Sequence, residues 1–246
     1  MEESARGSAI LITGGTGSIG LEIAARTAAE GAVVGVHGSR PESVDGALEK
    51  LRRRVPAGQF VPLPADFREN GAITALVEQF VADVGRLDGV VDCALGGPSG
   101  QVTGPFAATN PRHFEAHAAA ALGNLQTLCF AALPHLARQG GSFVAFASDS
   151  GRFAAPRQAV VGASMAGIIG FVRNIALEVA RDNIRVNCVT PSFVAETAIF
   201  ERFSQVAEGR AQAASRRPGW ACRSHPTSLH WYCSCSGRAQ PASPAK

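Results

Sequence analysis

The sequence predicts a single α/β domain in which helices cover both faces of a parallel sheet. Short apolar runs alternate with longer helical segments from about residue 9 to residue 189, which is typical of successive βα units. Several of these runs are continuously apolar, as expected for parallel strands that are buried on both faces. The length of 246 residues also fits one domain of this class.

The first βα unit, residues 8–29, contains a glycine-rich turn. An apolar strand at residues 9–12 leads into the turn at residues 13–20, and a helix follows. Glycines let such a turn bring backbone N–H groups close to a ligand, and a helix N-terminus attracts a phosphate. We interpret the unit as a dinucleotide pyrophosphate site, the alternative being an ordinary glycine-rich turn. The residues expected to hold the cofactor there are Thr13, Gly14, Gly15, Ser18, Ile19 and Gly20.

The second strand, residues 31–37, ends in a loop that indicates the type of cofactor. In dinucleotide folds an acidic residue near this position binds the ribose 2′-hydroxyl of NAD, whereas an arginine accommodates the 2′-phosphate of NADP. No Asp or Glu stands there, and the loop carries Ser39 and Arg40 instead. The loop therefore favours NADP, the alternative being an arginine that only faces solvent.

The alternating pattern continues after this loop. Asp66 follows a third apolar strand, and a loop rich in glycine and proline at residues 96–104 follows a fourth. The expected elements are helices at 43–54 and 71–84 and strands at 60–63, 89–94, 142–147 and 184–189.

Two long helices, at residues 111–138 and 158–181, are apolar over most of their surfaces. A helix that is apolar nearly all round does not expose an ordinary solvated face. We infer that the two helices pack against a partner subunit, the alternative being burial under the chain's own tail. Small residues of the second helix would let another backbone approach closely: Gly162, Ala163, Ala166, Gly167 and Gly170.

The composition of the chain restricts the kinds of partner that it is expected to bind and the cell compartment in which it is expected. The formal net charge is +3, and no basic stripe precedes the tail, which argues against nucleic acid as a partner. We expect no stretch to cross a membrane, and the N-terminus lacks the apolar region of a signal peptide, so a cytoplasmic location is expected. The six cysteines need not form disulfides there. Cys233 and Cys235 lack the spacing of a zinc site, so no metal is expected.

The motifs, in this order and spacing, resemble the short-chain dehydrogenase/reductase family. The resemblance runs from about residue 9 to residue 200 and implies a Rossmann-like, doubly wound sheet. It also implies an NAD(H) or NADP(H) cofactor, with Asp66 among the residues that bind it, and hydride exchange with a carbonyl or alcohol carbon. In that family a Tyr acts as acid/base, a Lys lowers its pKa, a Ser orients the substrate and an Asn holds a water. The segments that carry the resemblance are 13–20, Asp66, the strand after 87–88, Ser148, 176–178 and 184–191.

The chain departs from the family pattern where the chemistry is expected. Ser148 matches the family's Ser, but the Tyr and Lys positions hold Val161 and Met165, which cannot transfer a proton. The Asn position on the first long helix holds Ala121. Loss of an acid/base typically costs roughly 10²–10⁴-fold in rate, so Ser148 is expected to be only a remnant of a catalytic site. After the fourth strand, the family's Asn-Asn-Ala-Gly is replaced by a segment with Asp92, Cys93 and Leu95. Ser18 stands at the middle glycine of the cofactor turn, and Ser192 replaces the glycine of the family's Pro-Gly. Asn124 lies one turn beyond the Asn position.

The chain changes character at residue 218, so we divide it into a domain at residues 1–217 and an irregular tail at 218–246. The tail has no periodicity and holds both tryptophans and the sole tyrosine, Tyr232. Residues 219–246, back-translated and read one base out of frame, permit an apolar Leu-Phe-Leu stretch followed by Ile-Thr-Gly-Gln, which family members have near their C-terminus. We hypothesise that a frameshift replaced the family's last helix and strand, the alternative being a divergent tail.

A scaffold with an emptied site indicates a non-catalytic subunit, paired with an intact homologue in a heterotetrameric NADP-dependent ketoreductase. The pattern resembles the two-subunit reductases of aminocoumarin antibiotic biosynthesis, which oxidise a carrier-tethered β-hydroxytyrosyl group to β-ketotyrosyl. No motif in the chain reads that substrate. We expect the isolated chain to be inactive and NADP to bind it weakly or to be shared with the partner. Two alternatives stay open: a stand-alone dinucleotide-binding or sensing protein, and an active reductase with a rearranged site.

Overall fold

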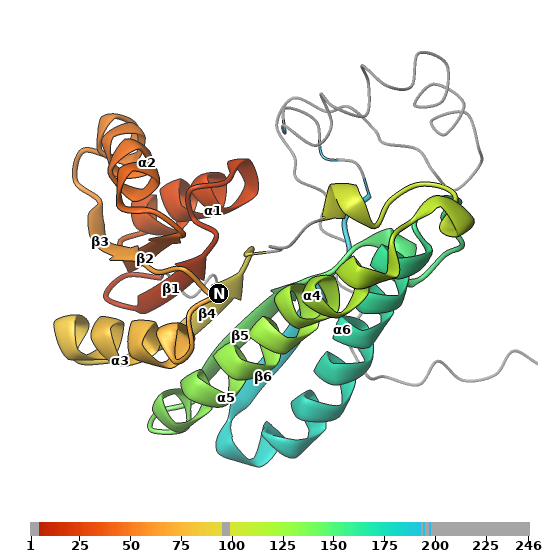
Figure 1. The fold of residues 1–246 in the computed structure, drawn as a ribbon. Helices are drawn as coiled ribbons and strands as arrows, with labels where there is room; N and C mark the ends of the chain where they lie inside the picture. The colour runs from red at the N-terminus through yellow and green to blue at the C-terminus, as the bar shows by residue number, and fades with distance from the viewer. Residues whose placement is uncertain (1–4, 95–98, 193, 195–196, 198–246) are drawn as a thin grey trace, which may run out of the picture.

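The sheet has six parallel strands in the order β3-β2-β1-β4-β5-β6 within the part of the chain that the structure describes. The structure is a computed structural model, and it describes residues 5–94, 99–192, 194 and 197 (Figure 1). The strand order reverses between β1 and β4, and ligands of such sheets bind beyond the carboxyl ends of the strands at this point. The strands are β1 (Ala9–Thr13), β2 (Val33–Gly38), β3 (Gln59–Pro64), β4 (Gly89–Asp92), β5 (Gly141–Phe146) and β6 (Ile184–Val189).

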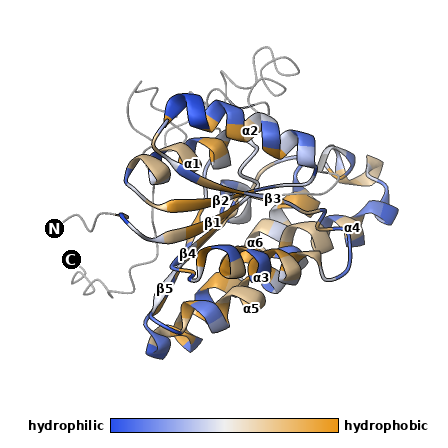
Figure 2. Ribbon diagram, turned by 90° about the vertical axis from the view of Figure 1, so that its left-hand side faces the viewer, coloured by the Kyte–Doolittle hydropathy of each residue, from blue (hydrophilic) through white to orange (hydrophobic). Residues whose placement is uncertain are grey.

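Helices cover the two faces of the sheet in separate groups, with α1 and α2 on one face and α3, α5 and α6 on the other (Figure 2). Side chains alternate between the two faces along each strand. In β1, Leu11 packs with the α3, α5 and α6 side, and Ile12 packs with the α1 and α2 side. The fold class predicted from the sequence is therefore confirmed. The principal helices are α1 (Ser18–Ala29), α2 (Pro41–Arg54), α3 (Ala72–Val84), α4 (Phe114–Ala118), α5 (Asn124–Leu136) and α6 (Ala159–Glu178).

The first long helical segment is a composite rather than one regular helix. A 3₁₀ turn at Pro111–His113 leads into α4, a π-helical turn at Ala119–Gly123 follows, and α5 completes the segment. Single π turns inside α-helices are frequent at functional sites. Ala121, which stands at the family's Asn position, lies in the middle of this π turn and is buried. Further 3₁₀ turns occupy Ser99–Gln101, Phe106–Ala108, Asp149–Gly151 and Ala180–Asp182.

Two helical segments are long and apolar enough to cross a membrane by length and composition, contrary to the expectation from the sequence. They are Pro111–Leu136, with a mean hydropathy of 1.2 over its most apolar window, and Ala159–Glu178, with 1.7. The expectation about length and composition was therefore wrong. The core helix of a soluble protein passes the same test when it is mostly buried, whereas 39% and 22% of these two windows are buried. Both segments pack one side against the apolar core next to the sheet (Figure 2).

The small residues of α6 serve two different purposes. A Cβ atom on Gly162 would lie 2.8 Å from the carbonyl oxygen of Ser150, so here the chain's own backbone makes the close approach. Gly167 similarly packs against the side chain of Leu122. A Cβ atom on Gly170, in contrast, would have no atom of the described residues within 4 Å. Of these three glycines, only Gly170 leaves room for a second molecule.

Candidate functional site

The glycine turn after β1 folds back on itself so closely that two of its glycines cannot carry a side chain. Gly14 has a φ of +64°, and a Cβ atom there would lie 2.6 Å from the carbonyl oxygen of Cys93. A Cβ atom on Gly20 would lie 2.3 Å from the carbonyl oxygen of Gly14. The N–H of Gly17 donates to the same oxygen at 3.0 Å. Backbone rather than side chains therefore forms this wall of the site.

Helix α1 presents its first backbone N–H groups beside this turn. The helix begins at Ser18 with Gly17 as N-cap, no side chain caps it, and its first turn contains no acidic residue. The N–H of Leu21 already donates to the carbonyl oxygen of Gly17 at 2.8 Å. The earlier N–H groups of an α-helix have no partner within the helix, so those of Ser18, Ile19 and Gly20 can bind an anion.

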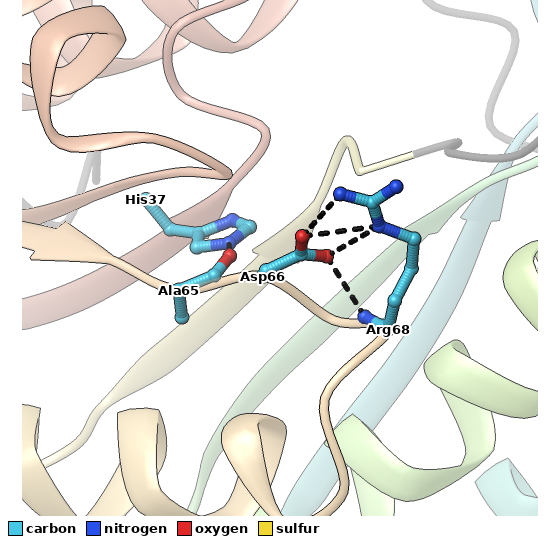
Figure 3. A network of polar contacts seen from close by, with 4 residues as sticks. All are labelled: His37, Ala65, Asp66 and Arg68. Carbon is cyan, nitrogen blue, oxygen red and sulfur yellow. Dashed lines mark hydrogen bonds and ion pairs between the residues drawn. The ribbon is translucent and has the colours of Figure 1, made fainter.

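His37, near the end of β2, links the glycine turn to the loop after β3. Its Nδ1 atom accepts a hydrogen bond from the Gly14 N–H at 3.1 Å. Its Nε2 atom lies 3.0 Å from the Ala65 carbonyl oxygen, a contact that Figure 3 shows. The ring also stacks on Phe67, with centroids 4.1 Å apart. Burial lowers the pKa of the imidazole from its ordinary value of 6.5, opposed by the hydrogen bond to Ala65. A neutral ring protonated at Nε2 satisfies both hydrogen bonds.

Thr13 and Asp92 lie opposite each other at the carboxyl ends of β1 and β4. The Thr13 hydroxyl donates to the Asp92 carboxylate, and the Ala94 N–H donates to the same oxygen at 3.2 Å. Burial raises the pKa of the Asp92 carboxyl, although these two hydrogen bonds lower it. Burial and the nearby Asp92 charge also raise the pKa of the Cys93 thiol, which keeps the thiol protonated and unreactive. The position at which the family has two asparagines thus holds a buried acid and a thiol.

Asp66, predicted to bind the cofactor, forms an ion pair with Arg68 in the loop after β3. The Nε atom of Arg68 lies 2.9 Å and 3.0 Å from the two carboxylate oxygens, and Nη2 donates to Oδ2 (Figure 3). The Arg68 backbone N–H also donates to Oδ1 at 3.0 Å. The guanidinium and these hydrogen bonds lower the pKa of Asp66 from 3.8 to about 2. The carboxylate therefore stays charged at any physiological pH.

These groups surround a cavity of about 660 Å³ at the point where the strand order reverses. The cavity extends from the glycine turn to the loops after β2 and β3, and the α4–α5 segment closes it with Ala116, Ala120 and Asn124. Asn124, which the sequence placed one turn beyond the family's Asn position, thus lines the cavity. The other lining residues are Gly14, Thr16, Gly17, His37, Gly38, Ser39, Ala65, Asp66, Phe67, Arg68, Cys93 and Ala94.

The predicted cofactor residues occupy three different places in this arrangement. Those that line the cavity are Gly14, Ser39 and Asp66, while Thr13, Gly15, Ser18, Ile19 and Gly20 form the turn and helix end behind it. Arg40 does not line the cavity: it is the exposed N-cap of α2, and its carbonyl oxygen accepts from the Ser43 N–H and hydroxyl. The sequence did not single out Arg68, and it offered His37 only as one of several histidines that could replace a missing base. No short motif marks the contacts that these two residues make in the fold.

Ser148 lies just after β5, beside the end of β6. The Ala147 N–H donates to the Val189 carbonyl oxygen at 2.8 Å, and the Asp149 N–H donates to that of Pro191 at 3.1 Å. The Ser148 hydroxyl donates to the Asp149 carboxylate at 3.1 Å and accepts weakly from the Ser150 N–H at 3.4 Å. The hydroxyl is thus engaged in shaping its own turn.

The first half of α6 packs directly against the Ser148 turn. A Cβ atom on Gly151 would lie 2.7 Å from the backbone of Met165 and Ala166, which shows how close the two segments are. The Met165 side chain is 4% exposed and belongs to the apolar core, and Val161 packs on the same core. Neither of the two positions that hold the family's acid/base and its tuning Lys therefore presents a group that exchanges protons.

Histidines are the remaining side chains that could replace a missing base. Both ring nitrogens of His37 are already hydrogen-bonded, one to Gly14 and the other to Ala65. His135 of α5 contacts the Glu78 carboxylate of α3 through its Nε2 atom at 2.9 Å. His113 accepts from Arg112 at 3.2 Å. His117 is buried and has no hydrogen-bond partner for either nitrogen among the described residues, and burial lowers its pKa.

We call the glycine turn, the N-terminus of α1 and the cavity together the cradle. The cradle fits one half of a dinucleotide better than the other. The side-chain-free turn, the helix N-terminus and the cavity fit a diphosphate and an adenosine. At the other end, Met165 replaces the Lys that holds the nicotinamide ribose in the family, and Ala121 replaces the Asn. Within the described residues, the shape of the site fits the diphosphate and adenosine half of a dinucleotide, and Val161 and Met165 stand where the family has its Tyr and Lys.

The sequence profile of the short chain dehydrogenase family matches residues 8–207. Nodulation protein G of Rhizobium sp. (strain N33) is 31% identical over 215 residues, which are 87% of this chain and 84% of that protein. The 3-oxoacyl-[acyl-carrier-protein] reductase FabG of Chlamydia muridarum (strain MoPn / Nigg) is 31% identical over 194 residues, 76% of this chain and 73% of that protein. The tail predicted at 218–246 lies beyond the matched range and outside the described residues, so the frameshift hypothesis stays a prediction.

Solved structures agree with the fold. The crystal structure of an NAD⁺-bound xylitol dehydrogenase is 25% identical and superimposes with a TM-score of 0.76, covering 84% of this chain and 79% of that one. Levodione reductase, at 24% identity, superimposes with a TM-score of 0.78 over 87% of this chain and 83% of that one. The second likeness supports the fold alone.

Proposed function

Because the chain belongs to the short-chain dehydrogenase/reductase family, whose members are oxidoreductases, we propose that it is a non-catalytic subunit of a heteromeric NADP-dependent member. One observation carries this proposal. Val161 and Met165 stand in place of the acid/base and its tuning Lys, and Met165 is buried in the core.

The cofactor part of the proposal rests on the cradle around the 660 Å³ cavity. The glycine turn and the N-terminus of α1 would hold the diphosphate, and the loops after β2 and β3 would hold the adenosine. The NADP preference rests on the absence of an acidic residue in the loop at Ser39 and Arg40. When bound, the nicotinamide of such a cofactor supplies or accepts a hydride. Without Lys at position 165, we expect binding to be weak or shared with the partner.

The partner part of the proposal rests on the outer face of α5 and α6. Phe130 is 79% exposed and Leu177 is 82% exposed, and both are large apolar side chains. Large apolar side chains that a monomer exposes to water are available to a partner subunit. Gly170 adds a gap in the same region of α6 that a second helix can fill. We propose an intact homologue as the occupant of this face, with segments 111–138 and 158–181 forming the contact in a heterotetramer.

The substrate part of the proposal rests on the relatives. The chlamydial relative is a reductase of 3-oxoacyl groups on an acyl carrier protein. Oxidation of a carrier-tethered β-hydroxytyrosyl group to β-ketotyrosyl is the reverse direction of the same type of reaction. We propose that the complex performs this oxidation in aminocoumarin antibiotic biosynthesis, in the cytoplasm and with neither nucleic acid nor membrane as partner.

The proposal is tested by co-expressing the chain with an intact Tyr-x-x-x-Lys homologue from the same organism. We expect a stable complex in light scattering and NADP-dependent turnover of a carrier-bound β-hydroxyacyl substrate. Turnover should vanish when the homologue's Tyr is changed to Phe, and should persist with Ser148→Ala in this chain. A stable monomer that binds a dinucleotide and ignores the homologue would instead favour the sensing protein. Turnover by the isolated chain that disappears with Ser148→Ala would establish a rearranged active site.

A further inference from the structure

The cavity contains one lysine or arginine side chain among its described lining residues, and it is Arg68. Its side chain is 88% exposed, so a bound ligand can reach the guanidinium directly. The same cavity is lined by the glycine turn at one end and by Ser39 after β2. His37 lines the same wall, but the hydrogen bonds at both of its ring nitrogens fit a neutral imidazole. Arg68 is therefore the positive charge that the cavity offers to an anionic ligand.

Asp66 fixes the orientation of the Arg68 guanidinium but accepts from only some of its N–H donors. The contacts from the Arg68 side chain to Asp66 come from Nε and Nη2. No hydrogen bond among the described residues uses Nη1. Figure 3 shows the guanidinium standing over the carboxylate with one terminal nitrogen pointing away from it. A guanidinium has five N–H donors in a planar fork, so one edge can bind the carboxylate while the end of the fork binds a phosphate.

The strand order indicates which phosphate this would be. Arg68 follows β3, and β3 is separated from β1 by β2. Neighbouring strands lie about 4.8 Å apart, so Arg68 is roughly 10 Å across the sheet from the turn that would take the diphosphate. A cation at that distance, on the side of the adenosine loops, is placed for a phosphate on the adenosine ribose. Ser39, after β2, lies between the two positions.

We propose that Arg68, oriented by Asp66, binds the 2′-phosphate of NADP and so sets the preference for NADP over NAD. The inference rests on the proposed dinucleotide binding and assigns its specificity to a residue that the sequence did not indicate. Arg40, the sequence-based candidate, is an exposed N-cap outside the cavity. Asp66 acts here as a positioning residue, because its charge is already balanced by the guanidinium that it holds.

The test compares two probes that need no catalysis, adenosine 2′,5′-bisphosphate and 5′-AMP, by calorimetric titration of the full chain. Hydrogen bonds to charged groups contribute about 1.5–3 kcal/mol, which corresponds to roughly a tenfold to hundredfold change in affinity. We expect Arg68→Ala to weaken the binding of the bisphosphate by at least about tenfold and to change the affinity for AMP by less than about threefold. Arg68→Lys should recover part of the loss, since it keeps the charge but not the fork. Asp66→Asn, which loosens the guanidinium, should weaken the binding of the bisphosphate less than Arg68→Ala does.

Arg52→Ala, which removes an exposed arginine of α2 outside the cavity, serves as the matched control. It should leave the affinity for both probes unchanged. Thermal unfolding of each variant shows whether it folds. If Arg68→Ala does not fold, the affinities of Arg68→Lys for the two probes decide the question. If the native chain binds neither probe, nor NADPH or NADH, both the proposed function and this inference fail. If it binds both probes and Arg68→Ala weakens them equally, or Arg40→Ala alone removes the preference, only the assignment to Arg68 fails.

Discussion

The Nδ1 atom of His37 accepts a hydrogen bond from the backbone N–H of Gly14 at 3.1 Å, so a side chain of β2 sets the shape of the turn after β1. The other ring nitrogen contacts the Ala65 carbonyl oxygen after β3. One imidazole thus connects the ends of three adjacent strands. It does so beneath the cavity wall, where a loss of either hydrogen bond leaves a backbone group without its partner.

Replacing His37 with Phe should destabilise the fold by about 1–3 kcal/mol, the cost of leaving buried backbone groups unpaired. Phe keeps the ring and its stacking on Phe67, so the loss reports the two hydrogen bonds rather than the packing. Urea unfolding of the two proteins measures the difference. An unchanged free energy of unfolding would mean that the His37 hydrogen bonds do not support the turn.

The stability of the native chain should fall as the pH is lowered below about 6.5, because His37 has a lowered pKa in the folded state. Above the ordinary pKa of 6.5 the ring is neutral in both states, and its contribution is complete. Below it the unfolded chain binds the proton first, so the free energy of unfolding decreases until the folded-state pKa is reached. Urea midpoints from pH 5 to 8 measure this slope. The His37→Phe variant should show a smaller slope over the same interval.

Gly20→Ala should cost about 1–3 kcal/mol of stability and abolish nucleotide binding, because its Cβ would lie 2.3 Å from the Gly14 oxygen. Gly17→Ala is the matched control in the same turn. Its Cβ would lie 3.4 Å from the Gly14 oxygen, an ordinary contact, so we expect a loss below about 1 kcal/mol. Thermal unfolding and calorimetric titration of NADPH measure both effects. Equal losses for the two variants would contradict the proposed crowding at Gly20.

The isolated chain should show no carbonyl reduction above background, since neither Val161 nor Met165 exchanges protons. An NADPH-oxidation assay at high enzyme concentration is the measurement. The double variant Val161→Tyr with Met165→Lys should stay inactive and unfold at lower temperature, because position 165 is only 4% exposed and an unpaired Lys there is desolvated. Activity in the double variant without loss of stability would show that the native packing around α6 tolerates a catalytic pair.

Gly170→Leu should weaken assembly with the homologue by about tenfold to a hundredfold, because it fills the gap on the outer face of α6. It should leave the isolated fold unchanged, since no described atom lies within 4 Å of the new Cβ. Gly46→Leu is the control on α2, where the Cβ position is equally open. Light scattering of co-expressed chains compares the two. If both variants assemble like the native chain, the contact does not lie along this part of α6.

The elements could be predicted from the sequence because each leaves a local signal. The strand expected at residues 184–189 has those bounds, and the expected helix at 71–84 is found at Ala72–Val84. Apolar runs and glycine turns depend on the backbone of a few neighbouring residues, which the sequence displays directly. The same holds for the glycine turn, whose conformation demands Gly14 and Gly20.

The contents of the site could be predicted only in part, because long side chains and cross-strand contacts leave no local signal. Arg40 stood at the expected position in the sequence, yet the fold uses it to begin α2 and brings Arg68 to the cavity. The partnership of His37 with Gly14 depends on the pairing of β1 with β2, which no short motif specifies. The small residues of α6 could be counted, but which of them faces the chain's own Ser150 depended on the fold.

The π turn at Ala119–Gly123 fits one more residue into its segment than a regular α-helix would. Adding a residue to a regular α-helix rotates everything after it by about 100°, because an α-helix has 3.6 residues per turn. The wider π turn takes up the extra residue locally, so Leu125, Leu128 and Cys129 of α5 still fill the core. Deleting one residue from this turn should therefore give a regular α-helix and leave the packing of α5 in place.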